Sequence, residues 1–183
     1  MDSCFRRNVN LCYGRNMIIQ KQAQDLKPVL MKGVKPQLKH PYYLIKEQEQ
    51  VIFAVTPGKN GAEFNKTIGY FSNFPGMQTY QCLYGSGILL MQRNDLAEAK
   101  EFKLVTLNSG RQVLVPAGWG MCLVNTGNNF LIVLRNSLLD EKYQDENPIL
   151  GKGGLAYFVV EKKGEISFIE NPNYNFHPQI STE

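Results

Sequence analysis

Short apolar stretches recur through the middle of the chain and are separated by turn-forming residues. They are rich in Val, Ile, Tyr, Phe and Thr, which favour strands, and little helical period lies between them. Clusters such as Pro57-Gly58 and Asn108-Ser109-Gly110 punctuate the pattern. Many short strands at this interval predict an antiparallel sandwich or barrel. The predicted strands are residues 51–56, 64–71, 79–92, 101–107, 111–115, 121–125, 130–135 and 155–160.

The segments before and after this strand-rich region do not show the same pattern. Residues 1–16 have neither helical nor strand period and are rich in Asn and Arg, so a disordered extension is predicted, and Met17 is a candidate translational start. Three apolar bursts in residues 17–50 predict edge strands and loops that pack on a larger body. The chain therefore divides into an extension (1–16), N-terminal strands and loops (17–50), a barrel (51–172) and an extended tail (173–183).

Composition narrows the classes of function. The 183 residues suffice for one domain with a full core. The formal charge of +4 is spread among acidic residues, as in Glu161-Lys162-Lys163-Gly164-Glu165, which favours solvated edges over a nucleic-acid surface. No run reaches the length of a membrane span, and residues 1–16 lack the apolar stretch of a signal peptide. The expected compartment is the cytoplasm, with no membrane partner.

Four cysteines, Cys4, Cys12, Cys82 and Cys122, show no CxxC spacing. Cys82 and Cys122 fall within apolar strand patterns, where Cys usually behaves as a small buried hydrophobe. We therefore expect these two thiols to be structural rather than part of a disulfide or a zinc site.

The segment GRQVLVPAGWGMCLVN at residues 110–125 reads as two strands joined by a Pro/Gly turn. It resembles the second cupin motif, GxxxxxPxGxxHxxxN, except that Met121 stands where the motif has its metal-binding His. The first motif places HxH, a Glu and a Gly at positions held here by Tyr70, Ser72, Gln78 and Gly85.

Further segments are similar to the cupin-type glucose-6-phosphate isomerases of archaea and some bacteria. Residues 57–64 resemble that family's PGKxGxEF segment, and residues 67–72 fall where it has TxGHxH. The resemblance covers about residues 51–172. It implies an all-β double-stranded β-helix, a cupin jelly-roll barrel with N-terminal edge strands, and a homodimer.

In that family, three His and one Glu bind a divalent metal that assists proton transfer between C1 and C2 of the sugar. The matched positions here hold Tyr70, Ser72, Gln78 and Met121, so we expect no metal and no cofactor. Both histidines of the chain, His40 and His177, lie in flanking segments and are expected to be ordinary and partly exposed. A loosely aligned family His and Tyr that close over the substrate correspond to Asp145 and Asn147.

The ligand-binding candidates are Thr67, Gly69, Gln78, Tyr80 and Trp119. Thr67 and Gly69 fall where the family holds the sugar phosphate, and Tyr80 falls on a Tyr that lines the same cavity. The alternative is that Thr67 and Tyr80 are only strand formers. Trp119, the single Trp, either packs at the barrel mouth or stacks on a ligand.

Three hypotheses follow from these residues. The first is a diverged, metal-free relative of the isomerases that binds a small sugar-phosphate-like ligand without isomerising it. The second is a non-catalytic scaffold in which Tyr70 and Met121 fill the cavity. The third is an active sugar-phosphate isomerase with an atypical site that recruits a metal through residues such as Glu63 or His40.

Overall fold

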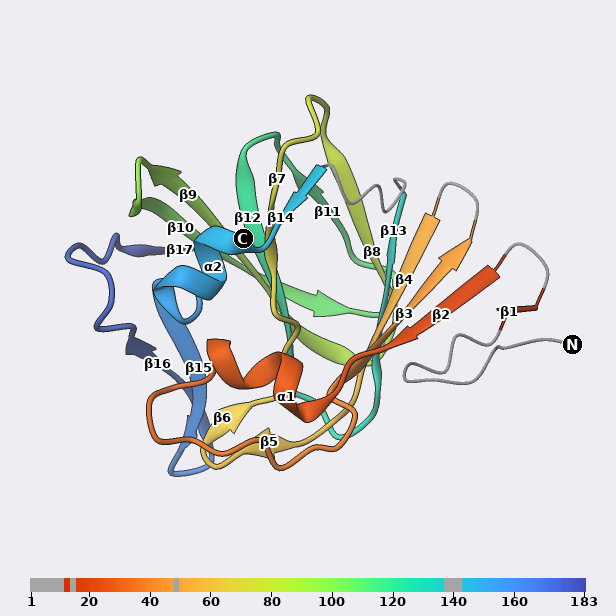
Figure 1. Ribbon diagram of the computed structural model, residues 1–183, viewed down its shortest axis with the longest axis horizontal. Coiled ribbons are helices and arrows are strands. Elements are labelled where there is room, and N and C mark those ends of the chain that lie inside the picture. Colours follow the sequence, from red (N-terminus) through yellow and green to blue (C-terminus); the bar gives the residue numbers. More distant parts are fainter. Residues whose placement is uncertain (1–11, 14–15, 48–49, 137–142) are drawn as a thin grey trace, which may run out of the picture.

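The structure is a computed structural model that describes residues 12–13, 16–47, 50–136 and 143–183. Most of the predicted disordered extension lies outside these residues. Figure 1 shows strands wrapped around a central core, with two short helices, α1 and α2, lying together on one side. No helix formed by the described residues has the length and apolarity needed to cross a bilayer.

The strands form two large sheets and one small sheet. The seven-stranded sheet has the order β1 (Cys12–Tyr13), β2 (Asn16–Gln20), β3 (Tyr42–Glu47), β4 (Gln50–Val55), β13 (Leu131–Arg135), β8 (Gln78–Tyr84), β11 (Gln112–Val115). The six-stranded sheet has the order β14 (Gln144–Asp145), β7 (Tyr70–Ser72), β12 (Trp119–Asn125), β9 (Ser86–Asp95), β10 (Glu98–Asn108), β17 (Ile180–Thr182). The four-stranded sheet has the order β16 (Glu165–Glu170), β15 (Tyr157–Lys162), β6 (Glu63–Phe64), β5 (Lys59–Asn60).

The chain passes repeatedly between the two large sheets, as a jelly roll requires. β8 belongs to the seven-stranded sheet and β9 to the six-stranded sheet, and β12 and β13 change sheets in the same way. The predicted all-β jelly-roll fold is therefore confirmed. Along β13, Leu131, Val133 and Arg135 are buried and the residues between them are partly exposed. These three side chains therefore lie on the inward face of the strand.

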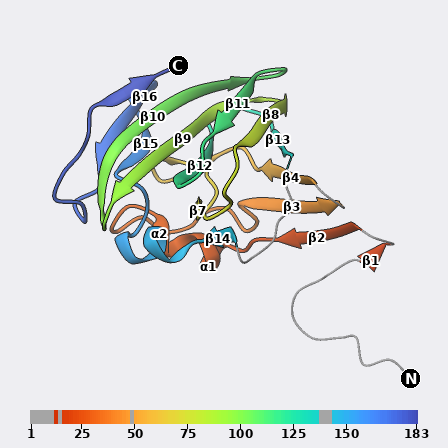
Figure 2. The ribbon, with the colours of Figure 1, turned by 90° about the horizontal axis from the view of Figure 1, so that it is seen from above.

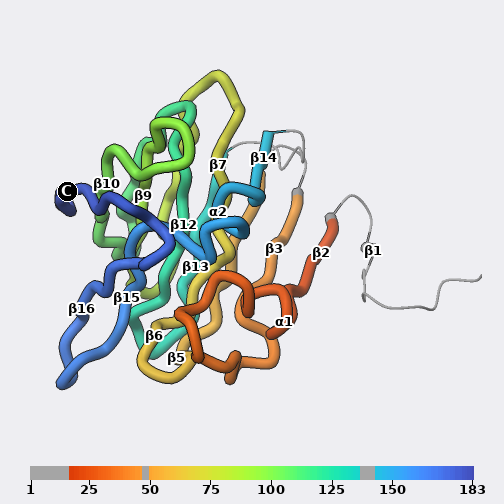
Figure 3. Tube along the Cα trace, turned by 60° about the vertical axis from the view of Figure 1, so that its left-hand side comes forward, coloured from red at the N-terminus to blue at the C-terminus, as the bar shows by residue number. Residues whose placement is uncertain are grey.

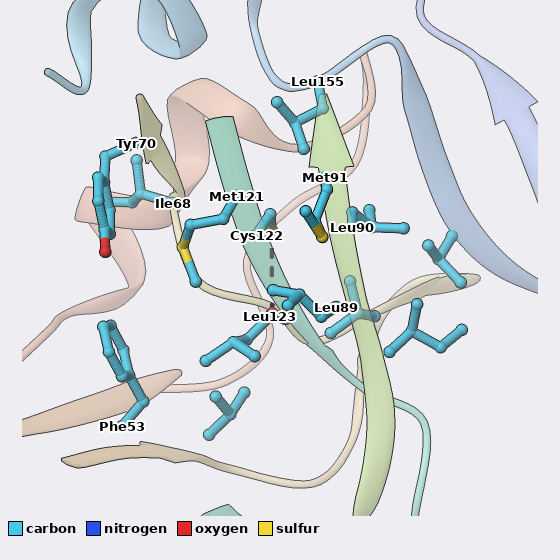
Figure 4. Close-up of a cluster of buried hydrophobic side chains, with 14 of the residues drawn as sticks. Phe53, Ile68, Tyr70, Leu89, Leu90, Met91, Met121, Cys122, Leu123 and Leu155 are labelled. Atoms are coloured by element: carbon cyan, nitrogen blue, oxygen red, sulfur yellow. Dashed lines mark hydrogen bonds between the residues drawn. The ribbon is translucent and has the colours of Figure 1, made fainter. Parts of the chain in front are cut away.

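The middle of the six-stranded sheet, formed by β9 and β12, is covered on both faces. All seven residues of β12 are buried, as are six consecutive residues of β9. A strand that is buried on one face would alternate, so continuous burial requires a second layer. Cys122, Leu90 and Leu155 border a small space of about 10 Å³ that Tyr157 and Val159 of β15 also line, so β15 contributes to that layer. Figure 4 shows the resulting cluster around β9 and β12.

The N-terminal segment was predicted only in part. β2 and β3 lie at the edge of the molecule, as predicted, and they extend the seven-stranded sheet, with Ile18 opposite Ile45 and Ile45 opposite Ile52. Figure 2 shows β4, β3 and β2 following one another toward the edge of the molecule. Between β2 and β3 lie α1 (Ala23–Leu26) and the 3-10 helix η1 (Lys27–Val29), which the apolar pattern did not predict.

The C-terminal part contains four elements that sequence reasoning missed, namely β14, α2, β16 and β17. β16 pairs with β15, and the tail, predicted to be merely extended, forms β17 in parallel pairing with β10. α2 (Asn147–Lys152) begins with Pro148 in its first turn and ends at Gly153 in the left-handed conformation, a pairing of signals typical of a short helix. Figure 3 shows α2 directly after β14 and close to α1.

The strand predicted over residues 64–71 is split into β6 and β7. Gly69 ends the irregular link between them, with φ of +82°. A Cβ built on Gly69 would lie 2.5 Å from the backbone oxygen of Met121, so the chain approaches β12 more closely there than any side chain allows. This close approach positions Tyr70 opposite Met121 at the start of β7.

A buried ion pair ties the helical N-terminal segment to the barrel. Lys66 Nζ lies 2.6 Å from Glu63 Oε1, and the two side chains are 6% and 0% exposed. Lys66 Nζ also donates to the backbone oxygen of Val29, and the Met31 N–H donates to Glu63 Oε2, at 2.6 and 2.8 Å. Both charges are thus satisfied by each other and by the segment that follows α1.

Replacing Gly69 with Ala should destabilise the fold through both strain and collision. The Gly110→Ala control has a φ of +90° but no atom within 4 Å of the added Cβ, so it carries the strain alone. We expect about 1–2 kcal/mol for Gly110→Ala and at least about 1 kcal/mol more for Gly69→Ala, measured by urea unfolding. Equal losses of unfolding free energy in the two variants would show that the backbone shifts away from Met121 to make room for the added Cβ.

Breaking the buried pair should cost much more than breaking an exposed one. Glu63→Gln leaves the Lys66 ammonium buried without its carboxylate, at a cost of about 3–5 kcal/mol. The control is Glu161→Gln, whose carboxylate lies 2.8 Å from Lys59 Nζ with side chains 39% and 36% exposed. Its expected cost is about 0–1 kcal/mol by urea unfolding, and a comparable loss in both variants would contradict the role assigned to Glu63.

Candidate functional site

The four positions matched to metal ligands all lie in the interior of the jelly roll. Tyr70 and Ser72 come from β7, Gln78 begins β8, and Met121 lies in β12 opposite Tyr70. Each of these side chains belongs to a residue no more than 4% exposed. Figure 4 shows Tyr70, Met121 and Phe53 projecting into the same interior space from β7, β12 and β4.

The centre of this space is a hydrogen-bonded cluster. The Tyr70 hydroxyl is bonded to the Tyr80 hydroxyl and accepts a hydrogen bond from Arg135 Nη1. Tyr80 and Arg135 come from β8 and β13, whereas Tyr70 comes from β7 of the other large sheet. The cluster therefore joins the two large sheets across the interior.

Arg135 is fully buried and is held by further contacts. With the Gln144 amide oriented so that its oxygen faces the guanidinium, Oε1 accepts from Nη1 and Nη2 at 3.2 and 3.1 Å. The guanidinium carbon lies 5.5 Å from the centroid of the Tyr70 ring and 5.9 Å from that of Phe53. Arginine commonly stacks on aromatic rings in this way.

The charge states of the cluster follow from its surroundings. Burial acts to lower the pKa of Arg135, but the Tyr70 and Tyr80 oxygens outweigh burial and raise it, so the guanidinium is cationic. Burial raises the pKa of Tyr80 well above its usual value, so that phenol is neutral. The interior thus holds a fixed positive charge surrounded by hydrogen-bonding oxygens.

Sequence reasoning missed Arg135 and Gln144. A signal for Arg135 was present, because Leu131, Val133 and Arg135 share one face of a strand whose apolar members point inward. Gln144 carried no comparable signal, since β14 has only two residues and is preceded by a polar stretch.

Thr67 and Gly69 are engaged in packing. Thr67 is 2% exposed, and its hydroxyl accepts from the Leu123 N–H at 3.0 Å. The Cys122 thiol donates to the Thr67 carbonyl at 3.2 Å, and burial raises the pKa of this thiol. Cys82 and Cys122 are both buried free cysteines, as expected. Neither Thr67 nor Gly69 lies in the Tyr70–Arg135 cluster, whereas Tyr80 does.

The other residues singled out from the sequence are Trp119, Asp145, Asn147 and the two histidines. Trp119 is 7% exposed at the start of β12, and Lys103 Nζ lies 5.3 Å from its ring. Asp145 Oδ1 accepts from the Asn147 N–H and side-chain amide, so these two residues bond to each other at the start of α2. His40 and His177 are partly exposed, and Nε2 of His177 is 2.8 Å from the Asn171 carbonyl.

Two open clefts lie in the described surface. One of about 430 Å³ lies between the β2–β3 edge and the β14–α2 segment, and Gln144 lines it. The other, of about 530 Å³, is bordered by Lys59, Phe64, Asn128 and Glu161. Within the described residues, no three His, Cys, Asp or Glu side chains are grouped closely enough to hold a metal ion.

Comparison with known proteins agrees with the motifs. A family model described as glucose-6-phosphate isomerase (GPI) matches residues 42–177. The glucose-6-phosphate isomerase of Thermococcus kodakarensis is 32% identical over 139 residues, which cover 72% of this chain and 70% of that protein. The enzyme of the same description from Pyrococcus abyssi is 30% identical over 139 residues with the same coverage.

Among solved structures, the capsular polysaccharide assembling protein CapF from Staphylococcus aureus covers 78% of this chain and 32% of its own, at 10% identity and a TM-score of 0.44. The match to the family model spans residues 42–177, which include both motif segments. The chain belongs to the cupin-type glucose-6-phosphate isomerase family.

Proposed function

We propose that this protein is a metal-free member of its family that binds a small sugar-phosphate-like ligand and does not isomerise it. The observation that carries the proposal is the guanidinium of Arg135 in hydrogen-bond contact with Tyr70, a position matched to a metal ligand. The family relationship supports the class of ligand.

The residues at the matched positions do not fit a divalent metal. A phenol, a hydroxyl, an amide and a thioether from Tyr70, Ser72, Gln78 and Met121 are weak donors for Fe, Mn, Ni or Zn. The cationic Arg135 beside Tyr70 would also repel a dication. Both the donor chemistry and the local charge therefore disfavour the ion.

Proton transfer between C1 and C2 needs a base beside that bond and a polarised carbonyl oxygen. Gln78 occupies the position of the family's Glu, and an amide has no carboxylate that accepts a proton near neutral pH. Glu63, a candidate for an atypical site, is already paired with Lys66 and bonded to the Met31 N–H. These contacts weigh against a rearranged isomerase site.

The scaffold hypothesis has an observation in its favour and is the second candidate. Tyr70, Tyr80, Met121 and Phe53 are all buried and occupy the interior that the hypothesis expected to be filled. On this hypothesis the protein would act through its surface and bind no small molecule. Homodimerisation and cytoplasmic location stay predictions, and sedimentation velocity at micromolar concentration tests the first.

Isomerisation of fructose 6-phosphate should be undetectable above the uncatalysed background, with or without added Mn²⁺ or Fe²⁺. The reason is the missing carboxylate at Gln78 together with a donor set that binds these ions weakly. A coupled assay for glucose 6-phosphate, run beside an active relative as positive control, makes the measurement. Robust turnover in either condition would refute the proposal.

Restoring the four ligands should recover metal binding fully only if Arg135 is also removed. For charges of +2 and +1 about 8 Å apart at an effective dielectric of about 20, the repulsion is about 4 kcal/mol, or roughly a thousandfold in affinity. The paired variants are Tyr70→His, Ser72→His, Gln78→Glu and Met121→His, with Arg135 retained or changed to Gln.

Titration calorimetry with Mn²⁺ compares these two variants, and circular dichroism verifies that both are folded. Equal affinity would show that Arg135 does not control the metal. Tight binding by the unaltered protein would contradict the metal-free proposal itself.

A further inference from the structure

The six residues of β16 form an open edge of the four-stranded sheet. β16 pairs with β15 from Glu165 to Glu170 and is the last strand of that sheet. Within the residues that the structure describes, no strand and no backbone hydrogen bond from a turn or loop occupies its other side. Figure 3 shows the β15–β16 hairpin at the margin of the molecule. An edge of this kind can accept a further strand.

Alternate residues of β16 direct their backbone groups toward the open side. Ile166 lies opposite Glu161 of β15, and the Glu161 N–H donates to the Ala62 carbonyl on the side of β15 away from β16. Glu161 and Ile166 therefore form a non-hydrogen-bonded pair, and the backbone groups of Ile166 point away from β15. The same orientation recurs at every second residue, so the residues with outward N–H and C=O groups are Ile166, Phe168 and Glu170.

The sequence of β16 lacks the features that most often protect an edge strand. Natural edge strands commonly carry Lys or Pro or are interrupted by a bulge. β16 reads EISFIE and pairs with β15 without a register shift. Ile166 and Ile169 are 47% and 44% exposed and lie on opposite faces of the strand. The edge thus combines outward backbone groups with exposed apolar side chains.

A cleft adjoins this edge on one face. Ile166 and Glu161 share a face of the hairpin and line the cleft of about 530 Å³ together with Lys59 and Phe64. Lys59 and Glu161 are paired with each other, which leaves Ile166 and Phe64 as apolar contacts. A residue opposite Ile166 on an added strand would share this face and direct its side chain toward the cleft.

We propose that β16 binds an extended peptide segment as an additional antiparallel strand, with main-chain hydrogen bonds to Ile166, Phe168 and Glu170 and an apolar side chain at the cleft. Recognition by strand addition draws its affinity from such main-chain bonds and its specificity from pockets for alternate side chains. The proposal concerns the surface of the molecule and does not depend on any ligand in the interior.

The charge of β16 identifies the chemistry of the partner. Glu165 and Glu170 are exposed at its two ends, and the strand has no basic residue. Opposite charges on facing residues stabilise a strand pair, and like charges destabilise it. The partner is therefore a segment with basic residues opposite both glutamates and apolar residues between them. Pairing two copies of β16 would instead place four carboxylates and no cation on one ladder, which disfavours a second copy.

Both carboxylates already have a basic neighbour within the chain. His177 Nδ1 lies 3.9 Å from Glu170 Oε2, and Lys162 of β15 lies opposite Glu165. These neighbours approach from within the chain and leave the open side of β16 to the partner. A carboxylate has two acceptor oxygens, so each can accept from a second basic residue on that side.

The experiment measures binding of a fluorescein-labelled KVFTVK peptide to the full chain by fluorescence anisotropy. Aligned antiparallel to β16, its two lysines face the two glutamates. It should bind at least about tenfold more tightly than EVFTVE, which replaces attraction with repulsion at both ends.

Backbone methylation of the peptide tests the main-chain bonds. N-methylation of the phenylalanine and the second valine, whose N–H groups face β16, should weaken binding about tenfold or more. The control is N-methylation of the threonine, whose N–H faces away from β16, and it should change affinity by less than about threefold.

Variants of the protein test the same contacts from the other side. Ile166→Pro removes an outward N–H but no bond to β15, and it should weaken KVFTVK binding by at least about fivefold. Ile166→Val keeps that N–H and should stay within about twofold of the unaltered protein. Circular dichroism verifies that both variants are folded.

Charge removal has a matched control. Glu165→Gln/Glu170→Gln should weaken KVFTVK binding about threefold to tenfold. Asp95→Asn/Glu183→Gln removes the same charge from exposed residues outside β16 and should leave the affinity within about twofold. Equal losses in the two double variants would reflect net charge alone and would overturn the assignment of the partner's basic residues.

Amide hydrogen exchange reads the edge directly. In the free protein the amides of Ile166, Phe168 and Glu170 should exchange rapidly, and saturating KVFTVK should slow them about tenfold or more. The amides of Ser167 and Ile169 point toward β15 and should be protected in both states. Outward amides that are already protected in the free protein, together with a dimer in sedimentation velocity, would assign the edge to a second copy and overturn the proposal.

The other contrary outcomes are equally specific. Equal affinity for KVFTVK and EVFTVE, unchanged affinity in Ile166→Pro, or no binding of KVFTVK at about 1 mM would each overturn the peptide site. None of these measurements involves a sugar phosphate, so their failure leaves the proposed function standing.

Discussion

The structure depends on how an arginine is accommodated inside a jelly roll. A buried guanidinium loses its hydration, and the protein must replace that hydration with hydrogen-bond acceptors and polarisable rings. Tyr70, Gln144 and the ring of Phe53 serve Arg135 in this way, and Tyr80 completes the cluster through Tyr70. Because Tyr70 and Gln144 belong to one large sheet and Arg135 to the other, satisfying the charge also fixes how the two sheets lie relative to each other.

The segments that most resemble the family have structural roles here. Glu63, within the PGKxGxEF-like segment, pairs with Lys66 and anchors the chain after α1. Asn125, the last position of the second cupin motif, donates to the carbonyls of Val55 and Asn129 and fixes the turn between β12 and β13. These contacts stabilise the barrel through residues other than Tyr70, Ser72, Gln78 and Met121.

The fold was largely predictable because period-two patterns and turn residues are local signals. Strands such as Gln112–Val115 and Leu131–Arg135 were found almost to the residue. β17 was missed because its stability comes from parallel pairing with β10, which is distant in sequence and leaves little local trace. β16 pairs with β15 across the two-residue Lys163–Gly164 turn, a local hairpin signal that the sequence reasoning overlooked. α1 and α2 have four and six residues, too few for a hydrophobic period to emerge.

The sequence predicted which residues lie at the candidate site but not which side chains surround them. The motif register located Tyr70, Ser72, Gln78 and Met121, and all four are indeed interior. What fills the space between them comes from Arg135 and Gln144, which lie outside both motifs and meet Tyr70 only when the two sheets close. A contact across two sheets is a property of the tertiary structure, and a motif taken alone cannot report it.

Net charge can be compared between this interior and the metal site that the motif resemblance implies. A divalent metal bound by three neutral His and one Glu carboxylate leaves a net charge of +1, and a guanidinium beside a phenol, a hydroxyl, an amide and a thioether also sums to +1. Under the proposed function, the attraction for an anionic ligand outlasts the metal. A guanidinium donates hydrogen bonds but has no vacant orbital to polarise a carbonyl as a Lewis acid does. Under the proposed function, exchanging one kind of cation for the other therefore separates binding of a sugar phosphate from its isomerisation.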